Sequence, residues 1–314
     1  MTTAKGRRAV NGSKGVNPFT AGCAWIDGDF VPIGEARVPI LDTGFTRSDL
    51  TYDVAAVWKR RFFRVEDHLD RLERSCGSLR LRLPKPRDEI RGLMIECVRH
   101  GGFDDAFVEV VVTRGVPLPG DRDPRNATQR LYVYAVPYVW IVQPEVQQRG
   151  VDVVIARDTI RIPPSAVDPR VKNFHWADLT RGLFEAYDRG AALALMTDGR
   201  GNITEGTGFN IFAVRSDGGL MTAEDGVLEG ITRRTVIEIG RADGHGVHVG
   251  PLRAENVTGA SEVFLTSTAG GVMPVASVDG VRLGDECPGP VTRRISSRYW
   301  DLHGESEHTI SIDQ

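Results

Sequence analysis

Several features that are common in other protein classes are scarce or missing in this 314-residue sequence. The net charge of −3 gives no bulk attraction to nucleic acid or to anionic membranes. No run of apolar residues is long enough to span a bilayer. The four cysteines lie far apart, without a Cys-x-x-C pair or a metal-type Cys/His spacing. We therefore expect a cytoplasmic globular protein with reduced thiols and with no metal, membrane or nucleic acid among its partners.

Lysine is also scarce, with five residues against 34 arginines. Two of the lysines lie in residues 1–23, which lack the apolar core of a signal peptide and which we expect to form a flexible arm. The last one is Lys172, in "RVKNFHWADL". Most lysines are solvated surface charges. However, a desolvated lysine can lose its proton and become an amine nucleophile, whereas arginine stays protonated. Lys172 is therefore a candidate for such chemistry.

Apolar patterning divides the rest of the chain into two predicted domains. The first, residues 24–137, combines strand-like pieces, including "AWIDGDFVPI", "ARVPILD" and "AFVEVVVTRG", with helical patterns that begin near Val65 and Pro86. A linker is expected at 138–150. The second domain, residues 151–314, has β-rich runs such as "AALALMTD", "GNITEG" and "SEVFLTS", and three helical segments. The predicted fold class is α/β or α+β.

Two downstream motifs contain residue types that suit a Schiff-base lysine. Pyridoxal phosphate, the commonest cofactor held in this way, needs a carboxylate at its pyridine nitrogen and an anion site for its phosphate. "NITEGTGFNIF" places Glu205 at a turn, and "LEGITRRTV" starts a helical pattern at Ile231 and Thr232, whose N–H groups can face an anion. Taken alone, a solvated turn glutamate and simple N-capping by Thr232 explain these motifs equally well.

The order of the motifs is more specific than any one of them. "VKNFHWADLTRGLFEA", "TDGRGNITEGTGFNIF", "GVLEGITRRTV" and "SEVFLTSTAGGVMPVASVDG" together resemble the fold type IV pyridoxal-phosphate aminotransferases, which include branched-chain and D-amino-acid transaminases. "SDLTYDVAAVW", "HLDRLERSC" and "VEVVVTRG" are most similar to the (R)-selective amine transaminases. The resemblance runs from about Trp25 to the end. It implies a small α/β domain, a larger β-barrel-like domain with helices, and a homodimer with its active site at the subunit interface.

The resemblance also implies roles for individual residues. Lys172 matches the Schiff-base lysine, which also moves the proton between Cα and C4′, and Glu205 matches the acid at the pyridine nitrogen. Tyr52 matches a tyrosine of the substrate pocket. The positions that bind the phosphate match Arg71, Ile231, Thr232 and Thr268.

Three further residues are candidate substrate contacts. Trp176 lies near the place where branched-chain enzymes carry a tyrosine, which favours the amine subgroup. Arg47 stands where amine transaminases often have histidine, and it binds a substrate carboxylate, faces solvent or pairs with Asp49. Arg122, in the loop "PLPGDRDPR", is a second candidate for a keto-acid carboxylate.

The resemblance thus predicts a ping-pong transaminase that uses pyridoxal phosphate and moves an amino group between an (R)-amine, or a D-amino acid, and a keto acid such as pyruvate, through a Lys172 aldimine. The alternatives are a D-amino-acid or branched-chain transaminase, a lyase similar to aminodeoxychorismate lyase, and a non-catalytic homologue. The intact set of Lys172, Glu205 and Arg71 argues against the last of these.

Overall fold

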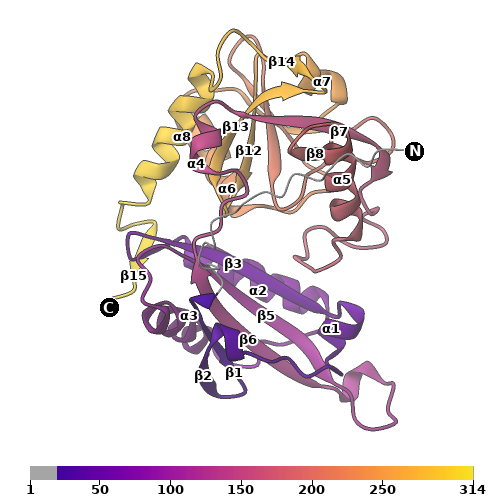
Figure 1. Ribbon diagram of the computed structural model, residues 1–314, viewed down its shortest axis with the longest axis vertical. Coiled ribbons are helices and arrows are strands. Elements are labelled where there is room, and N and C mark those ends of the chain that lie inside the picture. The colour runs from indigo at the N-terminus through magenta and orange to yellow at the C-terminus, as the bar shows by residue number, and fades with distance from the viewer. Residues whose placement is uncertain (1–19, 314) are drawn as a thin grey trace, which may run out of the picture.

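The computed structural model describes residues 20–313, which form two lobes, each built on one β-sheet (Figure 1). The strand order is β15-β4-β3-β5-β6-β1-β2 in the first sheet and β11-β10-β9-β12-β13-β7-β8 in the second. Two sheets with helices packed against them confirm the predicted α+β class. The predicted arm falls almost entirely outside the described residues.

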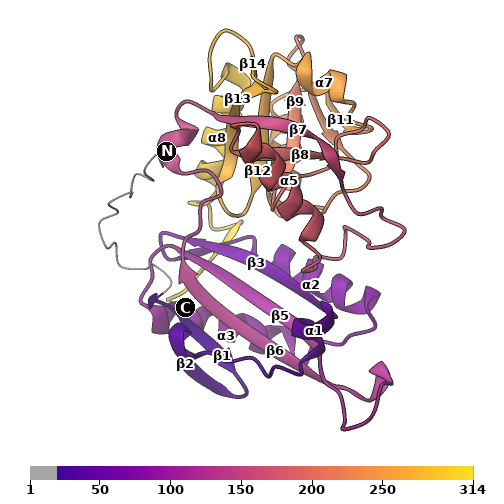
Figure 2. The same ribbon diagram turned by 45° about the vertical axis from the view of Figure 1, so that its right-hand side comes forward.

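The first sheet is antiparallel throughout, and two helices cover one of its faces (Figure 2). Leu69 and Leu72 from one helix and Ile90 from the other pack against strand residues such as Val57 and Val108 in a buried core. The elements are β1 (Cys23–Ile26), β2 (Asp29–Pro32), α1 (Thr43–Arg47), β3 (Leu50–Trp58), β4 (Arg61–Phe63), α2 (Val65–Ser78), α3 (Arg87–Gly101), β5 (Ala106–Val116) and β6 (Thr128–Pro137).

The second sheet is mixed, with parallel pairs at both ends of the strand order and antiparallel pairs between them. Helix α5 packs on β7 and β8, whereas α6 and α8 cover β12. The elements are α4 (Pro144–Gln147), β7 (Val151–Ile160), α5 (Ala177–Asp188), β8 (Leu193–Thr197), β9 (Asn210–Val214), β10 (Leu220–Ala223), α6 (Ile231–Ala242), β11 (Val247–Gly250), α7 (Ala254–Thr258), β12 (Glu262–Ser267), β13 (Gly271–Val278), β14 (Val281–Arg282) and α8 (Pro290–Leu302).

The end of the chain returns to the first lobe. Figure 1 shows α8 running down the side of the second lobe, after which β15 (Thr309–Ser311) pairs with β4. Ile312 is fully buried in the core of the first lobe. The predicted second domain, residues 151–314, therefore wrongly includes β15, which is a strand of the first sheet. A three-residue edge strand carries too little periodicity to be assigned from sequence. The other domain bounds stay a prediction.

Two strand predictions are wrong. Residues 36–42 are irregular and largely exposed, since Pro39 has no N–H to donate and no neighbouring strand pairs with them. "GNITEG" forms only isolated bridges: Thr197 with Ile203, Asn202 with Arg253, and Gly206 with Phe209. In the part of the chain described by the structure, no helix is both long and apolar enough to cross a membrane.

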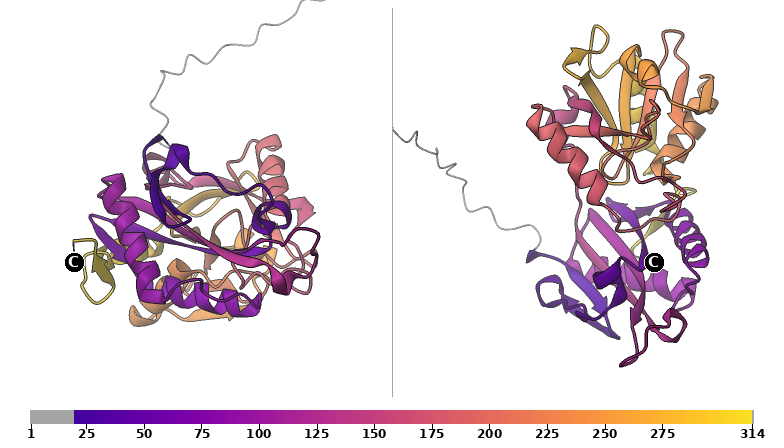
Figure 3. Two further views of the ribbon diagram at one scale, coloured as in Figure 1. Left: turned by 90° about the horizontal axis from the view of Figure 1, so that it is seen from below. Right: turned by 90° about the vertical axis from the view of Figure 1, so that its right-hand side faces the viewer.

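The second face of the first sheet points toward the second lobe (Figure 3). Side chains alternate along a strand, so even-numbered residues of β3 and odd-numbered residues of β5 share this face. Tyr52 and Val54, opposite Val111 and Glu109, are among them. The face is therefore free to form one wall of a site between the lobes.

Candidate active site

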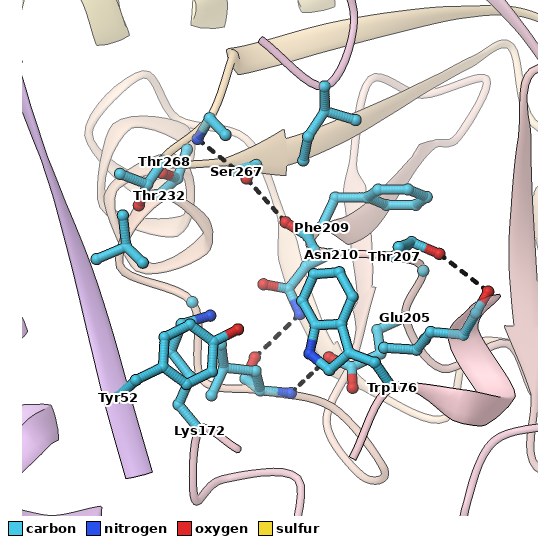
Figure 4. Close-up of a pocket in the computed structure, with 18 of the residues that line it drawn as sticks. Tyr52, Lys172, Trp176, Glu205, Thr207, Phe209, Asn210, Thr232, Ser267 and Thr268 are labelled. Carbon is cyan, nitrogen blue, oxygen red and sulfur yellow. Dashed lines mark hydrogen bonds between the residues drawn. The ribbon is translucent and has the colours of Figure 1, made fainter. Parts of the chain in front are cut away.

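A cavity of about 780 Å³ lies between the two lobes. Of the predicted site residues, all but Arg47 and Arg122 line its walls: Tyr52, Arg71, Lys172, Trp176, Glu205, Ile231, Thr232 and Thr268. Figure 4 shows Lys172 beside Tyr52, with Thr232, Ser267 and Thr268 grouped at another wall. Residues that lie far apart in the sequence thus share one site.

Lys172 is held by its backbone, which leaves its amine free to reach into the cavity. Its carbonyl oxygen accepts hydrogen bonds from Thr51 Oγ1 at 2.7 Å and from the Tyr52 N–H at 3.2 Å. Its Nζ lies 4.4 Å from the centroid of the Tyr52 ring, within the range of a cation–π contact. The segment between β7 and α5 is therefore fixed to β3 of the other lobe.

Glu205 is a buried carboxylate with a partner for each oxygen. Arg161 Nε donates to Oε1 at 3.0 Å, and the Leu228 N–H donates to Oε2 at 2.8 Å. Burial raises the pKa of Glu205 above its ordinary value, although the charge of Arg161 and the Leu228 N–H partly offset the shift. The carboxylate is thus fixed in direction before any ligand binds.

Arg161 was missed by the sequence analysis. Its guanidinium is 7 % exposed and also donates to Asp178 Oδ2 at 2.6 Å, which accepts a further bond from the Ile162 N–H at 2.8 Å. Asp178 stands in the first turn of α5, where a helix dipole favours an acid. Nothing in the sequence marks an arginine at the end of a strand as the partner of two distant carboxylates.

Arg71 is fixed in a similar way in the first lobe. Its Nε and Nη2 donate to the two oxygens of Asp53 at 2.7 and 2.8 Å, and Nη1 donates to the Glu229 carbonyl at 3.1 Å. Burial alone would raise the pKa of Asp53, but Arg71 outweighs it and holds that pKa well below the usual range. Burial lowers the pKa of the adjacent His68, so this imidazole is neutral at pH 7.

Helix α6 begins at the cavity wall with its first N–H groups unused by a side-chain cap. Its N-cap is Gly230, and a Cβ there would lie 2.3 Å from Asn210 Oδ1, so a larger residue would displace the Asn210 side chain. Ile231 and Thr232 follow at the wall. Nearby, Thr266 Oγ1 lines the cavity and is buried without a hydrogen-bond partner within residues 20–313. This end of the cavity has donors available for an anion.

These features fit pyridoxal phosphate. One lysine amine reaches the cavity, a buried carboxylate faces it, and a helix N-terminus with free N–H groups lies at its wall beside an arginine and an unpartnered hydroxyl. The amine, the carboxylate and the anion-binding end match, in that order, the carbonyl, the basic ring nitrogen and the phosphate of this ligand.

The three remaining substrate candidates differ in where they lie. Trp176 lines the cavity, and its ring approaches Gly208. Arg47 and Arg122 are exposed and are not part of the walls that this chain supplies. Asp49 pairs with Arg114 at 2.7 Å rather than with Arg47. A role for Arg47 or Arg122 in binding a carboxylate stays a prediction.

Glu109 is a second residue that the sequence analysis missed. It is a lone acid in the apolar strand β5, it is 7 % exposed, and it lines the cavity. Burial raises its pKa to about 7, a shift that would be larger without the hydrogen bond of Tyr134 and the charge of Lys172. A charged residue interrupting a β-branched run was the available signal, since such positions are otherwise apolar.

Replacing Arg161 tests the buried ion network. Arg161→Met leaves Glu205 and Asp178 buried without their cation, so the free energy of unfolding should fall by about 3–5 kcal/mol. Arg157→Met, within the preceding strand β7, is the matched control, because Arg157 is exposed and its pair with Asp279 contributes less than about 1 kcal/mol. Urea denaturation of both variants measures the difference, and equal losses would contradict the assignment.

Comparison with known proteins agrees with this geometry. The profile of the family "Amino-transferase class IV" matches residues 50–278. A branched-chain-amino-acid aminotransferase of Pseudomonas aeruginosa is 29% identical over 90% of this chain and 92% of its own length.

Two solved structures are similar over both lobes. The branched-chain aminotransferase of Thermoproteus uzoniensis with norvaline is 28% identical, with a TM-score of 0.84, and the match covers 93% of this chain and 99% of that one. The branched-chain amino acid aminotransferase of Thermobaculum terrenum in its PLP-form is 26% identical, with a TM-score of 0.82, over 94% of this chain and 99% of its own.

The family profile covers well over half of the chain, and the solved relatives share both lobes. The fold type expected from the order of the motifs is therefore confirmed, as is the cofactor. The chain belongs to the class IV aminotransferases and is a pyridoxal-phosphate-dependent enzyme of that family.

Proposed function

We propose that the enzyme transfers the amino group of an (R)-amine to a keto acid such as pyruvate, so that the amine becomes a ketone and pyruvate becomes alanine. The observation that supports a donor without a carboxylate is the charge of the cavity wall. Both wall arginines, Arg71 and Arg161, are bound to internal carboxylates, and Glu109 adds an acid. Within residues 20–313, the wall offers no uncommitted guanidinium to a substrate carboxylate.

The residues that would hold pyridoxal phosphate lie at three places in the cavity. Arg71, the N–H groups of Ile231 and Thr232, and the Thr268 hydroxyl would bind the phosphate. When bound, the cofactor supplies an electrophilic carbonyl and a ring that accepts an electron pair.

Two side chains would carry the proton chemistry. Lys172 Nζ is the point of attachment and the base that removes a proton from the substrate Cα, which requires its neutral amine. The Glu205 carboxylate holds a proton at the ring nitrogen, and Arg161 keeps that carboxylate in place. Ping-pong kinetics follow, because donor and acceptor use the same cavity in turn.

A branched-chain transaminase is the second candidate. It is favoured by the names of the relatives, which are branched-chain aminotransferases. In that case the donor carries a carboxylate as well as the keto-acid acceptor, and the described wall spares no cation for it. Arg47 or Arg122 from a partner subunit would have to supply it.

We also propose that the enzyme is a homodimer. The resemblance implies one, and the segment before and within α1 exposes apolar side chains that a monomer would leave in water, including Ile40 at 73 % and Phe45 at 68 %. The Arg122 loop, which exposes Leu118, lies in the same lobe.

A substrate panel tests the donor class. With pyruvate as acceptor, (R)-1-phenylethylamine should be turned over at least about tenfold faster than its (S) isomer, which corresponds to about 1.4 kcal/mol between the two transition states. Turnover of L-leucine, but of neither amine, would establish the branched-chain reading instead. Turnover of D-alanine alone, measured with 2-oxoglutarate as acceptor because alanine and pyruvate only exchange into each other, would indicate a D-amino-acid transaminase.

Replacing Lys172 tests the nucleophile and base. Lys172→Arg keeps the charge but removes the amine, so kcat should fall by about 10²–10⁴-fold or more. Lys85→Arg is the control, because Lys85 lies outside the cavity walls, where it pairs with Glu89 and contacts the ring of Trp25. Initial rates of amino transfer give the comparison, and full activity of Lys172→Arg would rule the role out.

The mass in solution tests the dimer. Light scattering should give twice the chain mass of 34.5 kDa. Phe45→Asp should shift the protein toward the monomer, because it places a charge in the proposed apolar contact. A wild-type monomer at micromolar concentration that retains full activity would contradict the proposal.

A further inference from the structure

Glu109 is a carboxyl group of the active site that none of the roles above uses. It lies in a row across the first sheet, opposite Val54 on β3 and Tyr134 on β6. All three residues line the cavity, as does Phe107 two positions earlier on the same strand. Among residues 20–313, no arginine or lysine forms an ion pair with Glu109. A buried acid is rarely kept without a cation unless it meets a ligand.

The charged and titratable groups that act on Glu109 come from three elements. Tyr134 on β6 forms a hydrogen bond with Glu109. Lys172, in the segment before α5, attracts the negative charge of Glu109. Both effects lower the pKa of Glu109. Asp53 on β3 repels that charge and raises the pKa, and Tyr52 on the same strand faces Tyr134. Burial exceeds these effects and brings the pKa to about 7, so the carboxyl changes its charge within the neutral range.

We propose that Glu109 selects substrates by their charge, admitting a keto-acid carboxylate when it is protonated and excluding it when it is ionised. In the protonated form, its hydroxyl donates a hydrogen bond to the substrate carboxylate. In the ionised form, two negative charges meet in a cavity of low dielectric, where repulsion is much stronger than in water. An amine without a carboxylate does not meet this repulsion and contacts Val54 and Phe107 in either state.

This inference rests on the proposed function, since it assigns a specificity-determining residue to the acceptor that follows the amine donor. It predicts that the two half-reactions differ in whether they need Glu109 to be protonated. The acceptor reaction with pyruvate needs a proton on Glu109, whereas the donor reaction with an amine that has no carboxylate does not. In a ping-pong enzyme the two are separable, because kcat/KM for the acceptor does not depend on the donor.

The test compares pyruvate with methyl pyruvate, which has the same reacting carbonyl but no charge. The measured quantity is kcat/KM for pyruvate divided by kcat/KM for methyl pyruvate. Both values come from initial rates of the cofactor-loaded enzyme between pH 6 and 9. Groups that act equally on both acceptors cancel in this ratio. For the wild type, the ratio should fall by up to about tenfold for each pH unit above the pKa of the carboxyl.

Two variants identify the group. In Glu109→Gln the ratio should not change with pH, because the amide carries no charge. In Tyr134→Phe the fall should move to higher pH, since the ionised carboxylate loses a hydrogen bond that stabilises it. Each ratio divides two rates of the same preparation, so a general loss of activity in either variant cancels.

A wild-type ratio that is constant with pH would overturn the inference, and so would the same fall in Glu109→Gln. Failure of the proposed function is read separately, from the donor panel. If L-leucine proves to be the donor, the acceptor ratio is still measured with it. A donor panel that favours the (R)-amine, combined with the same fall of the ratio with pH in Glu109→Gln as in the wild type, would reject the role of Glu109 and leave the proposed function standing.

Discussion

The two lobes meet at the backbone of Lys172. Thr51 and Tyr52, neighbours on β3, donate hydrogen bonds to the carbonyl oxygen of this one residue. One end of the contact is a strand in the interior of the first sheet, and the other is the segment that leads from β7 to α5. Because the backbone is fixed in this way, the position of the amine depends on both lobes. The cavity cannot form in either lobe alone, since each supplies only part of its wall.

Two buried ion clusters hold the ends of the cavity. Asp53 fixes Arg71 in the first lobe, and Asp178 with Glu205 fixes Arg161 in the second. Buried charges of this kind are tolerated only when each has its partner, and both arginines meet this condition through internal carboxylates. The clusters therefore orient groups of the wall. They leave Lys172, the start of α6, Glu109 and the remaining N–H groups of Arg71 as the groups available to ligands.

The cavity must bind a phosphate and a substrate, and different parts of its wall suit each of them. A phosphate needs donors and positive potential, which the N-terminus of α6 and Arg71 provide. An amine without a carboxylate needs apolar contacts. Val54, Phe107 and the rings of Tyr52 and Trp176 offer such contacts elsewhere along the wall. Glu109 stands among the latter group. In the role proposed above, protonation of its carboxyl decides whether a substrate with a carboxylate is admitted.

Local sequence determined the elements and part of the site. Periodicity placed α2, α3 and α5, and the scarcity of lysine together with the order of the motifs selected Lys172, Glu205 and the start of α6. These signals are local, since a helix face, a glycine before a helix or a motif spans only a few neighbouring residues. The tertiary structure alone decided the partners. Arg161 lies 44 residues from Glu205 along the chain, and Glu109 is significant only because β5 faces the second lobe. Pairing, burial and the pKa shifts that follow depend on distances in space, which no local pattern records.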